Sequence, residues 1–219
     1  MDPLAFSRRS GLTRIIPAVM LMLLAVPFAR AAAAIDNSSP QQLIETSSRA
    51  LLADLDANRD KYRRDKKALY KVVDEGFLPH VDVEFAAQQV LGKHWRTADA
   101  AQRKRFVTAF YQSLLQTYGD ALVEFTADQL RVLPYQGDPA ADRGTVRTEI
   151  RRSNGSLVAV NYSMRRNAAG QWKVWDVVIE GISYVKSFRE DFGLEIEQKG
   201  LEPVIKRLES GAVQPAGKA

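Results

Sequence analysis

The spacing of apolar residues divides the chain into a helical first part and a strand-forming second part. In residues 40–126, apolar residues recur every three or four positions, which is the period of an amphipathic helix. In residues 129–180 the period is two, as in β-strands whose side chains point to alternating faces. Between residues 183 and 209 the helical period returns. The pattern predicts helices, then a sheet, then closing helices.

Capping residues and helix breakers set the predicted limits of the helices. Ser39 followed by Pro40 is a helix start, and the apolar stripe that follows is expected to end near Asn58. A charge run, R-D-K-Y-R-R-D-K-K at 59–67, is either a solvated helix face or a contact for anionic head groups or a partner. It leads into a second helix that Pro79 stops. Asp82 is expected to cap a third helix, which Gly92 ends. Thr97 or Asp99 is expected to cap a long fourth helix.

Four runs with a period of two predict four antiparallel strands. They cover residues 130–135, 145–152, 156–165 and 171–180. The sequences S-N-G-S and N-A-A-G between the later runs are tight-hairpin signals. Helices followed by such a meander indicate an α+β fold, with a four-stranded antiparallel sheet and helices packed on it.

The last predicted strand lies in the stretch W-K-V-W-D-V-V-I-E-G-I-S-Y (172–184), which is apolar on both faces. Strict alternation divides its apolar residues into Trp172, Val174 and Val178 on one face and Trp175, Val177 and Ile179 on the other. An antiparallel strand in a small domain usually has one solvated face. Either the chain itself covers both faces here, or a bound apolar molecule covers one of them.

The first 34 residues have the three parts of a secretory signal peptide. Three arginines precede an apolar run at 15–29, and small residues follow it. The run is shorter than the about 20 residues of a spanning helix and contains two prolines, which favours a cleaved signal over an uncleaved anchor. We predict a cleavable signal peptide in residues 1–34, one domain in 35–210 and a flexible tail in 211–219.

Removal of that segment changes the charge of the protein. The whole chain carries a formal +5, and residues 1–34 hold four Arg and one Asp, so the remainder carries +2. A nucleic-acid-binding domain is strongly basic, and we expect no nucleic-acid partner. The chain has no cysteine, which excludes disulfides, thiolate metal sites and a lipidated N-terminus. We therefore expect an unlipidated periplasmic protein, with a monomer as the default state.

Residues suited to catalysis or metal binding are few. His80 and His94 follow helix ends without the spacing of a metal motif, so capping or surface roles are favoured over metal ligation. Asp176 in the last strand would serve as a general base if it lay in a pocket. The alternative is an ion pair with a cross-strand arginine, for example Arg147 or Arg151.

Several motifs follow one another along the chain. They are V-L-G-K-H-W-R-T-A at 90–98, A-A-Q-R-K-R-F-V-T-A-F at 100–110, T-Y-G-D-A-L at 117–122, W-K-V-W-D-V-V-I-E-G-I-S at 172–183 and G-L-x-x-x-I-x-x-L at 200–208. In order and spacing they resemble the MlaC, or toluene-tolerance, family of periplasmic phospholipid-binding (ABC transporter substrate-binding) proteins. Trp175 stands where Tyr is expected and Gly119 where Ala is usual.

The resemblance implies a carrier that moves phospholipid between two membrane complexes and so serves outer-membrane lipid asymmetry. One partner would be an outer-membrane lipoprotein–porin complex, and the other an inner-membrane ABC transporter with its MCE-type subunit. The implied fold is the curved cone of nuclear-transport-factor-2-like proteins with extra helices. No cofactor is implied, because the bound phospholipid is cargo. At about 0.8 kcal/mol per CH₂, two acyl chains of about 16 carbons gain about 25 kcal/mol of gross transfer energy on burial.

The predicted cavity lies between the concave face of the sheet and the helices. Its lining residues, chosen by face and size, are Val90, Phe106, Phe110, Leu114, Val146, Ile150, Val160, Tyr162, Trp175, Val177 and Ile179. Two alternatives remain. One is an enzyme on the same cone fold, of the ketosteroid-isomerase type, with Asp176 as its general base. The other is an interaction module with a filled core and no ligand.

Overall fold

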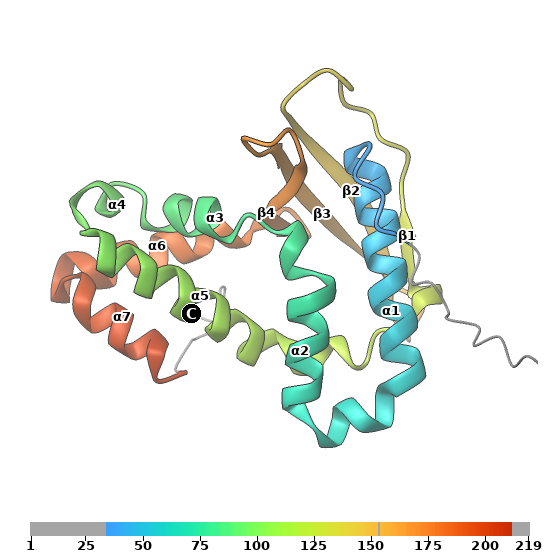
Figure 1. Ribbon diagram of the computed structural model, residues 1–219, viewed down its shortest axis with the longest axis horizontal. Coiled ribbons are helices and arrows are strands. Elements are labelled where there is room, and N and C mark those ends of the chain that lie inside the picture. The colour runs from blue at the N-terminus through green and yellow to red at the C-terminus, as the bar shows by residue number, and fades with distance from the viewer. Residues whose placement is uncertain (1–33, 153, 212–219) are drawn as a thin grey trace, which may run out of the picture. The chain divides into compact units, whose positions relative to one another are not determined.

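The computed structural model describes residues 34–152 and 154–211 (Figure 1). Its helices are α1 (Pro40–Arg64), α2 (Lys66–Gly76), η1 (Leu78–His80), α3 (Val83–Leu91), α4 (His94–Thr97), α5 (Ala100–Leu122), η2 (Ala127–Gln129), α6 (Tyr184–Lys199) and α7 (Leu201–Glu209). Its strands are β1 (Leu130–Val132), β2 (Arg143–Arg151), β3 (Leu157–Arg166), β4 (Trp172–Ile179) and β5 (Ile182–Ser183). The predicted α+β class is confirmed. Apart from residues 34 and 211, the predicted signal peptide and tail lie outside the described residues.

The strands form one antiparallel sheet in the order β1-β2-β3-β4-β5, so strands that are consecutive in the sequence are also adjacent in the sheet. The sheet has one strand more than the four predicted. The extra strand, β5, folds back on β4 through a turn at Glu180 and Gly181, whose φ angles are 50° and 84°. Two successive positive φ angles suit a tight hairpin that follows the twist of the strands.

A β-bulge interrupts the alternation of side chains in β4. Met164 of β3 lies opposite Val174, and the preceding residue, Ser163, lies opposite Asp176. Trp175 therefore has no counterpart on β3. An inserted residue of this kind exchanges the faces of all residues that follow it in the strand.

The bulge corrects the predicted division of β4 into two faces. Val177 and Ile179 lie on the face of Trp172 and Val174, whereas Val178 lies on the opposite face. The prediction that grouped Val177 and Ile179 with Trp175 is wrong, because a period of two assumes that every residue has a partner.

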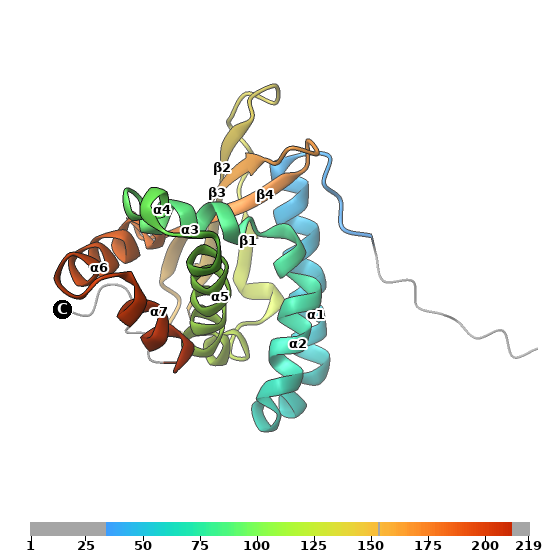
Figure 2. The ribbon, with the colours of Figure 1, turned by 60° about the vertical axis from the view of Figure 1, so that its left-hand side comes forward.

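Helix α1 packs on the sheet face that contains Trp172 and Val174, which we call the α1 face. Leu43 and Ile44 of α1 are buried there, together with Met164 of β3. Helices α1 and α2 lie side by side, as Figures 1 and 2 show. The first described helix thus covers part of the α1 face, while α3 and α6 contact β4.

The apolar interior consists of three clusters. The sheet cluster contains Leu43, Ile44, Val146, Met164, Trp172 and Val174. The helical cluster joins α3, α5, α6 and α7 around Phe106, Phe110, Phe188 and Phe192. The hairpin cluster holds Leu55, Tyr62, Leu69, Val73 and Val123. None of the described helices is both long and apolar enough to cross a membrane.

Helices α1, α3 and α5 start at the predicted N-cap residues. Ser39, Asp82 and Asp99 each accept a hydrogen bond from the amide three residues later, at 3.1, 3.1 and 2.8 Å. Helix α1, however, does not end near Asn58. It continues to Arg64, and Asn58 marks a kink with φ −124° and ψ 17°. The charge run is therefore mainly the last part of α1.

Candidate ligand-binding site

The α1 face of the sheet is apolar over most of its area. Directly opposed residues of an antiparallel pair share a face, so the register identifies its members. The apolar ones are Leu130, Val132, Val146, Ile150, Val158, Val160, Tyr162, Met164, Trp172, Val174, Val177 and Ile179. The Thr148 hydroxyl is satisfied, because it donates to the Val160 carbonyl at 2.6 Å. Arg166 at the end of β3 lies 4.7 Å from the centre of the Trp172 ring.

The first turns of α1 close one half of this face. Asn37, just before the helix, donates to the Trp172 carbonyl at 3.0 Å and accepts from the Trp172 amide at 2.7 Å. Gln41 accepts a hydrogen bond from the Tyr135 amide at 2.8 Å. These contacts hold α1 to both ends of the β-meander, and the side chains of the sheet cluster fill the space beneath it.

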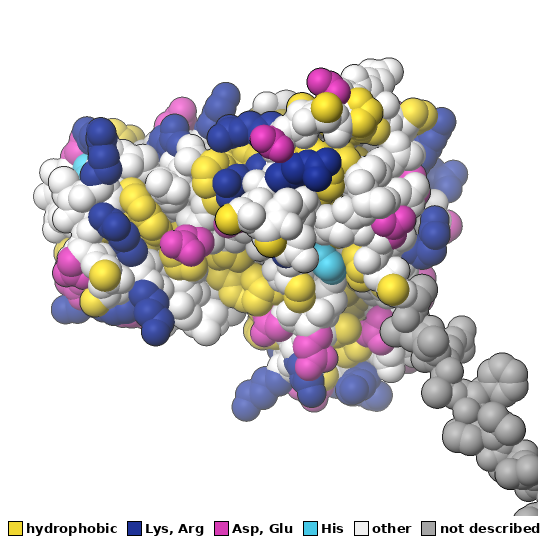
Figure 3. Space-filling model, turned by 45° about the horizontal axis from the view of Figure 1, so that its top comes forward, with side chains coloured by type: hydrophobic (Ala, Val, Ile, Leu, Met, Phe, Trp, Pro, Cys, Tyr) yellow, Lys and Arg dark blue, Asp and Glu magenta, His cyan; other side chains and the backbone are white. Residues whose placement is uncertain are grey.

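The other half of the α1 face lies outside all three clusters of described residues. It includes Val158 and Val160, which are buried, and Ile150 and Ile179, which remain partly exposed. In the space-filling view, hydrophobic side chains reach the surface in the middle of the molecule, between charged ones (Figure 3). Because Ile150 and Ile179 remain partly exposed, apolar surface of the α1 face continues beyond the part that α1 fills.

A pocket of about 340 Å³ opens between α1 and the edge strand β1. Its lining residues are Glu45, Ser48, Arg49, Leu52, Leu130 and Val132. The four helix residues are spaced as one stripe of α1, and the two strand residues belong to the α1 face. The pocket, which we call the α1–β1 groove, thus has an apolar floor and a polar rim. It lies at the β1 edge of the α1 face.

Two polar atoms are buried near the sheet cluster without a hydrogen-bond partner among the described residues. They are the Tyr135 hydroxyl and the Trp172 indole nitrogen. Gly144 leaves room for the first, because a Cβ atom at this position would lie 2.2 Å from the Tyr135 hydroxyl. A buried donor without a partner is unfavourable, so both atoms are available to a ligand or a water molecule.

Tyr162 places a further hydroxyl on the α1 face. Burial raises its pKa to about 12, and a hydrogen bond with Thr148 acts in the opposite direction. The phenol is therefore neutral at physiological pH. A neutral, partly exposed aromatic ring presents apolar area with one polar end.

The eleven predicted lining residues fall into two groups. Six of them share the α1 face: Val146, Ile150, Val160, Tyr162, Val177 and Ile179. The other five lie in or against the helical cluster: Val90, Phe106, Phe110, Leu114 and Trp175. The structure does not bring the two groups together in one lining.

The helical cluster is filled by its own aromatic rings. Neighbouring ring centres among Phe106, Phe110, Phe188 and Phe192 are 5.3 to 6.1 Å apart. Trp175 meets Phe85 of α3 edge to face at 5.5 Å. These contacts are typical of a packed core, so the α1 face is the better candidate for a ligand.

Sequence reasoning missed the part of the site that α1 and β1 supply. Leu52 sits beside the predicted stripe of α1, and Leu130 and Val132 belong to a strand of three residues. The predicted run 130–135 has apolar residues at both alternating sets of positions, so the sequence does not reveal which side faces the core. The pairing of Leu130 with Ile150 provides that information.

Asp176 has a structural role at the start of α6. Its carboxylate accepts a hydrogen bond from the Ser183 hydroxyl at 2.6 Å and from the Val185 amide at 3.0 Å. In the described part of the chain it forms no ion pair with an arginine, so the predicted pairing with Arg147 or Arg151 is wrong. Both of its oxygens instead fix the turn that leads from β5 into the helix.

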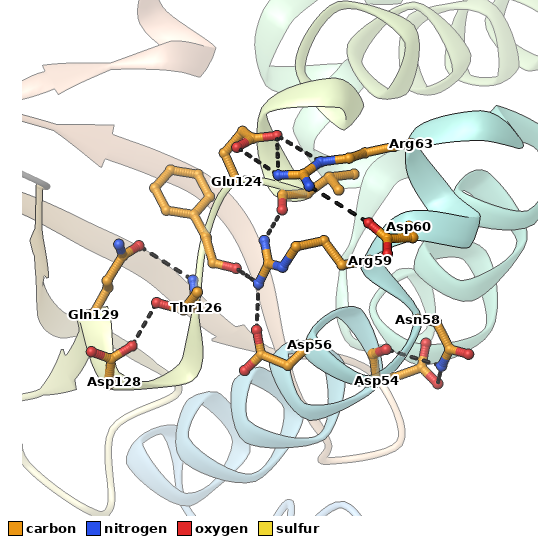
Figure 4. Close-up of polar contacts among 12 residues, drawn as sticks. Asp54, Asp56, Asn58, Arg59, Asp60, Arg63, Glu124, Thr126, Asp128 and Gln129 are labelled. Carbon is orange, nitrogen blue, oxygen red and sulfur yellow. Dashed lines mark hydrogen bonds and ion pairs between the residues drawn. The ribbon is translucent and has the colours of Figure 1, made fainter.

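The charge run at 59–67 ties the end of α1 to the segment between α5 and β1 (Figure 4). Arg59 donates to the carbonyls of Val123 and Phe125, the latter at 2.9 Å. Arg63 donates to Glu124 at 3.2 Å. The charge run thus attaches the part of α1 that follows the kink to residues 123–125.

Metal ligands are not grouped in residues 34–152 and 154–211, where no three His, Cys, Asp or Glu side chains are placed to hold an ion. Burial lowers the pKa of His80, and the nearby Lys173 charge adds to this effect. His80 is therefore neutral near pH 7.

Comparison with known proteins decides the family. The protein family described as MlaC protein matches the chain over residues 45–210. The chain belongs to the MlaC family. Its match begins within α1 and ends just after α7, so it includes the α1 face, the α1–β1 groove and the helical cluster.

Individual relatives agree with this assignment. The intermembrane phospholipid transport system binding protein MlaC of Haemophilus influenzae is 27% identical over 184 residues, which are 83% of this chain and 86% of that protein. The toluene tolerance protein ttg2D of Pseudomonas putida is 30% identical over 183 residues, which are 83% of this chain and 82% of that protein.

The fold is similar to that of a phospholipid-binding protein from Ralstonia solanacearum, solved in complex with a phospholipid. The TM-score is 0.73 at 21% sequence identity, and the match covers 80% of this chain and 97% of that one. The MlaC-family chain therefore shares the architecture of a solved phospholipid-binding protein.

Proposed function

We propose that this MlaC-family protein is a periplasmic phospholipid carrier that exchanges lipid with an outer-membrane complex and an inner-membrane ABC-type complex. Two observations on relatives support the proposal: a relative is described as part of an intermembrane phospholipid transport system, and a protein of the same fold was solved with a phospholipid. The observation that carries the proposal is the apolar α1 face, which extends beyond the area that α1 fills and has the α1–β1 groove at its β1 edge.

In this proposal the acyl chains lie between α1 and the α1 face of the sheet. The groove of about 340 Å³ is at the lower end of the size range of small-molecule pockets, which is about 300 to 1,000 Å³. A phospholipid with two acyl chains needs more room, so α1 has to separate from the sheet when lipid enters. The kink at Asn58 is suited to this movement, because Arg59 fastens the residues after it.

The head group stays at the rim of the groove, in contact with water. Burial of the acyl chains supplies the free energy of binding, at about 0.8 kcal/mol per CH₂. The proposal therefore requires no enclosed phosphate site. The unpartnered Trp172 indole and Tyr135 hydroxyl are the buried donors that remain for a glycerol ester or a water molecule.

The two alternatives have weaker support. An enzyme with Asp176 as its general base needs that carboxylate to face a substrate, but the carboxylate is engaged by Ser183 and Val185. A ligand-free interaction module needs a filled core. That requirement suits the helical cluster, but it does not explain the partly exposed Ile150 and Ile179 on the α1 face.

Native mass spectrometry of the protein purified gently from a bacterial periplasm tests the proposal. We expect the protein to retain a phospholipid mass. Val177→Glu puts a charge on the α1 face and should abolish loading, whereas Leu194→Glu, at a site 63% exposed on α6, should leave it intact. Circular dichroism checks that both variants fold, and Ile150→Asn is the milder variant if Val177→Glu does not. Repeated absence of lipid from the unmodified protein would contradict the proposal.

A further inference from the structure

The sheet face opposite to α1 carries a row of arginines along β2. Arg143, Arg147 and Arg151 occupy every fourth position, so they share this face and are spaced by about 14 Å in an extended strand. All three are exposed. We call them the arginine stripe. Arg131 of the neighbouring β1 lies on the same face.

The three arginines of the stripe form no ion pair with an acidic side chain of the described residues. Arg147 has no hydrogen bond or ion pair with any of them. Arg151 donates to the Asp128 backbone carbonyl at 3.2 Å, and Arg143 lies 5.7 Å from the centre of the Phe85 ring. The Asp128 carboxylate interacts with the charge of Arg151, so that end of the stripe is partly neutralised, whereas Arg143 and Arg147 are paired with no acidic side chain of the described residues.

Acidic groups on the same face are already engaged. Glu149 of β2 lies 3.7 Å from Arg131. Asp176 of β4 is buried, and its oxygens accept the bonds from Ser183 and Val185. The face therefore has a net positive charge although the chain after residue 34 carries only a formal +2.

Part of the surface beside the arginines is open and carries small side chains. Thr145 and Ala159 are exposed there, and Leu157 is 58% exposed at its edge. At the other end the stripe meets a pocket of about 330 Å³, whose lining includes Arg143, Arg165 and Arg166. Arg165 is paired with Asp82 and Arg166 with Asp142, which also lines the pocket, so the arginine without an ion pair in this pocket is Arg143 of the stripe itself.

We propose that the arginine stripe is the docking surface for a carboxylate-rich face of a partner protein in the transport system. The proposal rests on the proposed carrier function. Guanidinium groups bind carboxylates through paired hydrogen bonds, which give orientation as well as attraction. Charge complementarity also raises the rate of encounter between two proteins. A row of exposed arginines that form no ion pairs, with Arg147 at its centre, provides these features.

The position of the stripe favours a protein over a membrane surface as the partner. The α1–β1 groove opens on the α1 side of the sheet, whereas the stripe lies on the other side. A flat membrane against the stripe would face away from the groove. A docked protein leaves α1 uncovered, so lipid can still leave between α1 and the sheet.

Binding to the two membrane complexes of the same bacterium tests the proposal. Each complex is purified in detergent and immobilised, and lipid-loaded protein is passed over it at 50 and 300 mM NaCl. Vesicles containing phosphatidylglycerol form a third arm. Arg147→Glu should weaken binding to at least one complex by roughly tenfold or more at low salt. Arg64→Glu is the matched control, because Arg64 is exposed at the end of α1 and no described residue pairs with it.

Lipid loading, measured by native mass spectrometry, separates this proposal from the carrier function. Loading should be the same in Arg147→Glu, Arg64→Glu and the unmodified protein, and a loss in all three would contradict the carrier function instead. Unchanged binding of Arg147→Glu, an equal loss in Arg64→Glu, or a loss seen with the vesicles alone would overturn the docking proposal. Arg147→Gln, which removes the charge without reversing it, serves if the first variant does not fold.

Discussion

The side chain of Asn37 forms two hydrogen bonds with the backbone of Trp172, which is 135 residues later in the sequence. The amide donates to the carbonyl at 3.0 Å and its oxygen accepts from the backbone N–H at 2.7 Å. The Asn37 side chain thus forms the pair of hydrogen bonds that the backbone of a neighbouring strand would form at the start of β4. It holds the beginning of α1 against the α1 face, where the proposed carrier has to open.

We expect Asn37→Ala to loosen α1. Loss of two hydrogen bonds to a partly buried backbone should lower the free energy of unfolding by about 1 to 3 kcal/mol, measured in urea. Exchange of bound phospholipid with vesicles should become faster, because less energy is needed to separate α1 from the sheet. Asn161→Ala is the control, since the Asn161 side chain has no hydrogen-bond partner among the described residues. Slower or unchanged exchange in Asn37→Ala would contradict a role of this contact in opening.

Occupation of the α1–β1 groove should prevent loading. Val132 lines the groove on the β1 side, and Val132→Trp places a large ring in it. We expect the variant to fold and to lose most of its bound phospholipid in native mass spectrometry. Leu157→Trp adds the same ring at an exposed site on the opposite face and should keep the lipid. Full loading of Val132→Trp would show that lipid enters by another route.

The limits of sequence reasoning are clearest in β4. The residues W-K-V-W-D-V-V-I predict a strand correctly, because a run of β-branched and aromatic residues favours one. The alternation alone does not reveal that Trp175 is a bulged residue, since that depends on its pairing with β3. The position of one inserted residue moved Val177 and Ile179 to the α1 face, and with them part of the candidate site.

The sequence predicts an interaction more reliably when both of its partners are close together in the sequence. Ser39, Asp82 and Asp99 are separated by three residues from the amides that they cap, so their roles could be predicted from sequence. Arg59 is different, because its acceptors Val123 and Phe125 are more than 60 residues away. A charged side chain with distant backbone acceptors looks like any other solvated helix residue in the sequence.

Substitution of Asp176 separates a structural role from a catalytic one. Asp176→Asn keeps one acceptor oxygen but weakens the bonds to Ser183 and Val185, so the free energy of unfolding should fall by about 1 to 2 kcal/mol. Ser183→Ala should have a similar effect, and the double variant should lose less than the sum, because both changes affect one network. Phospholipid loading should persist in all three. An additive loss of stability would contradict the shared network.

The raised pKa of Tyr162 makes the free energy of unfolding depend on pH in the alkaline range. Its pKa is raised to about 12 by burial, whereas a tyrosine in an unfolded chain has a pKa of about 10. Between these values the unfolded chain loses the proton before the folded chain does, so stability decreases as pH rises from about 10 to 12. Below pH 10 both states are protonated and the contribution is fully present. We expect urea unfolding to show this decrease, with a shallower slope in Tyr162→Phe because the phenol is absent. An identical slope in the variant would mean that other groups cause the alkaline loss.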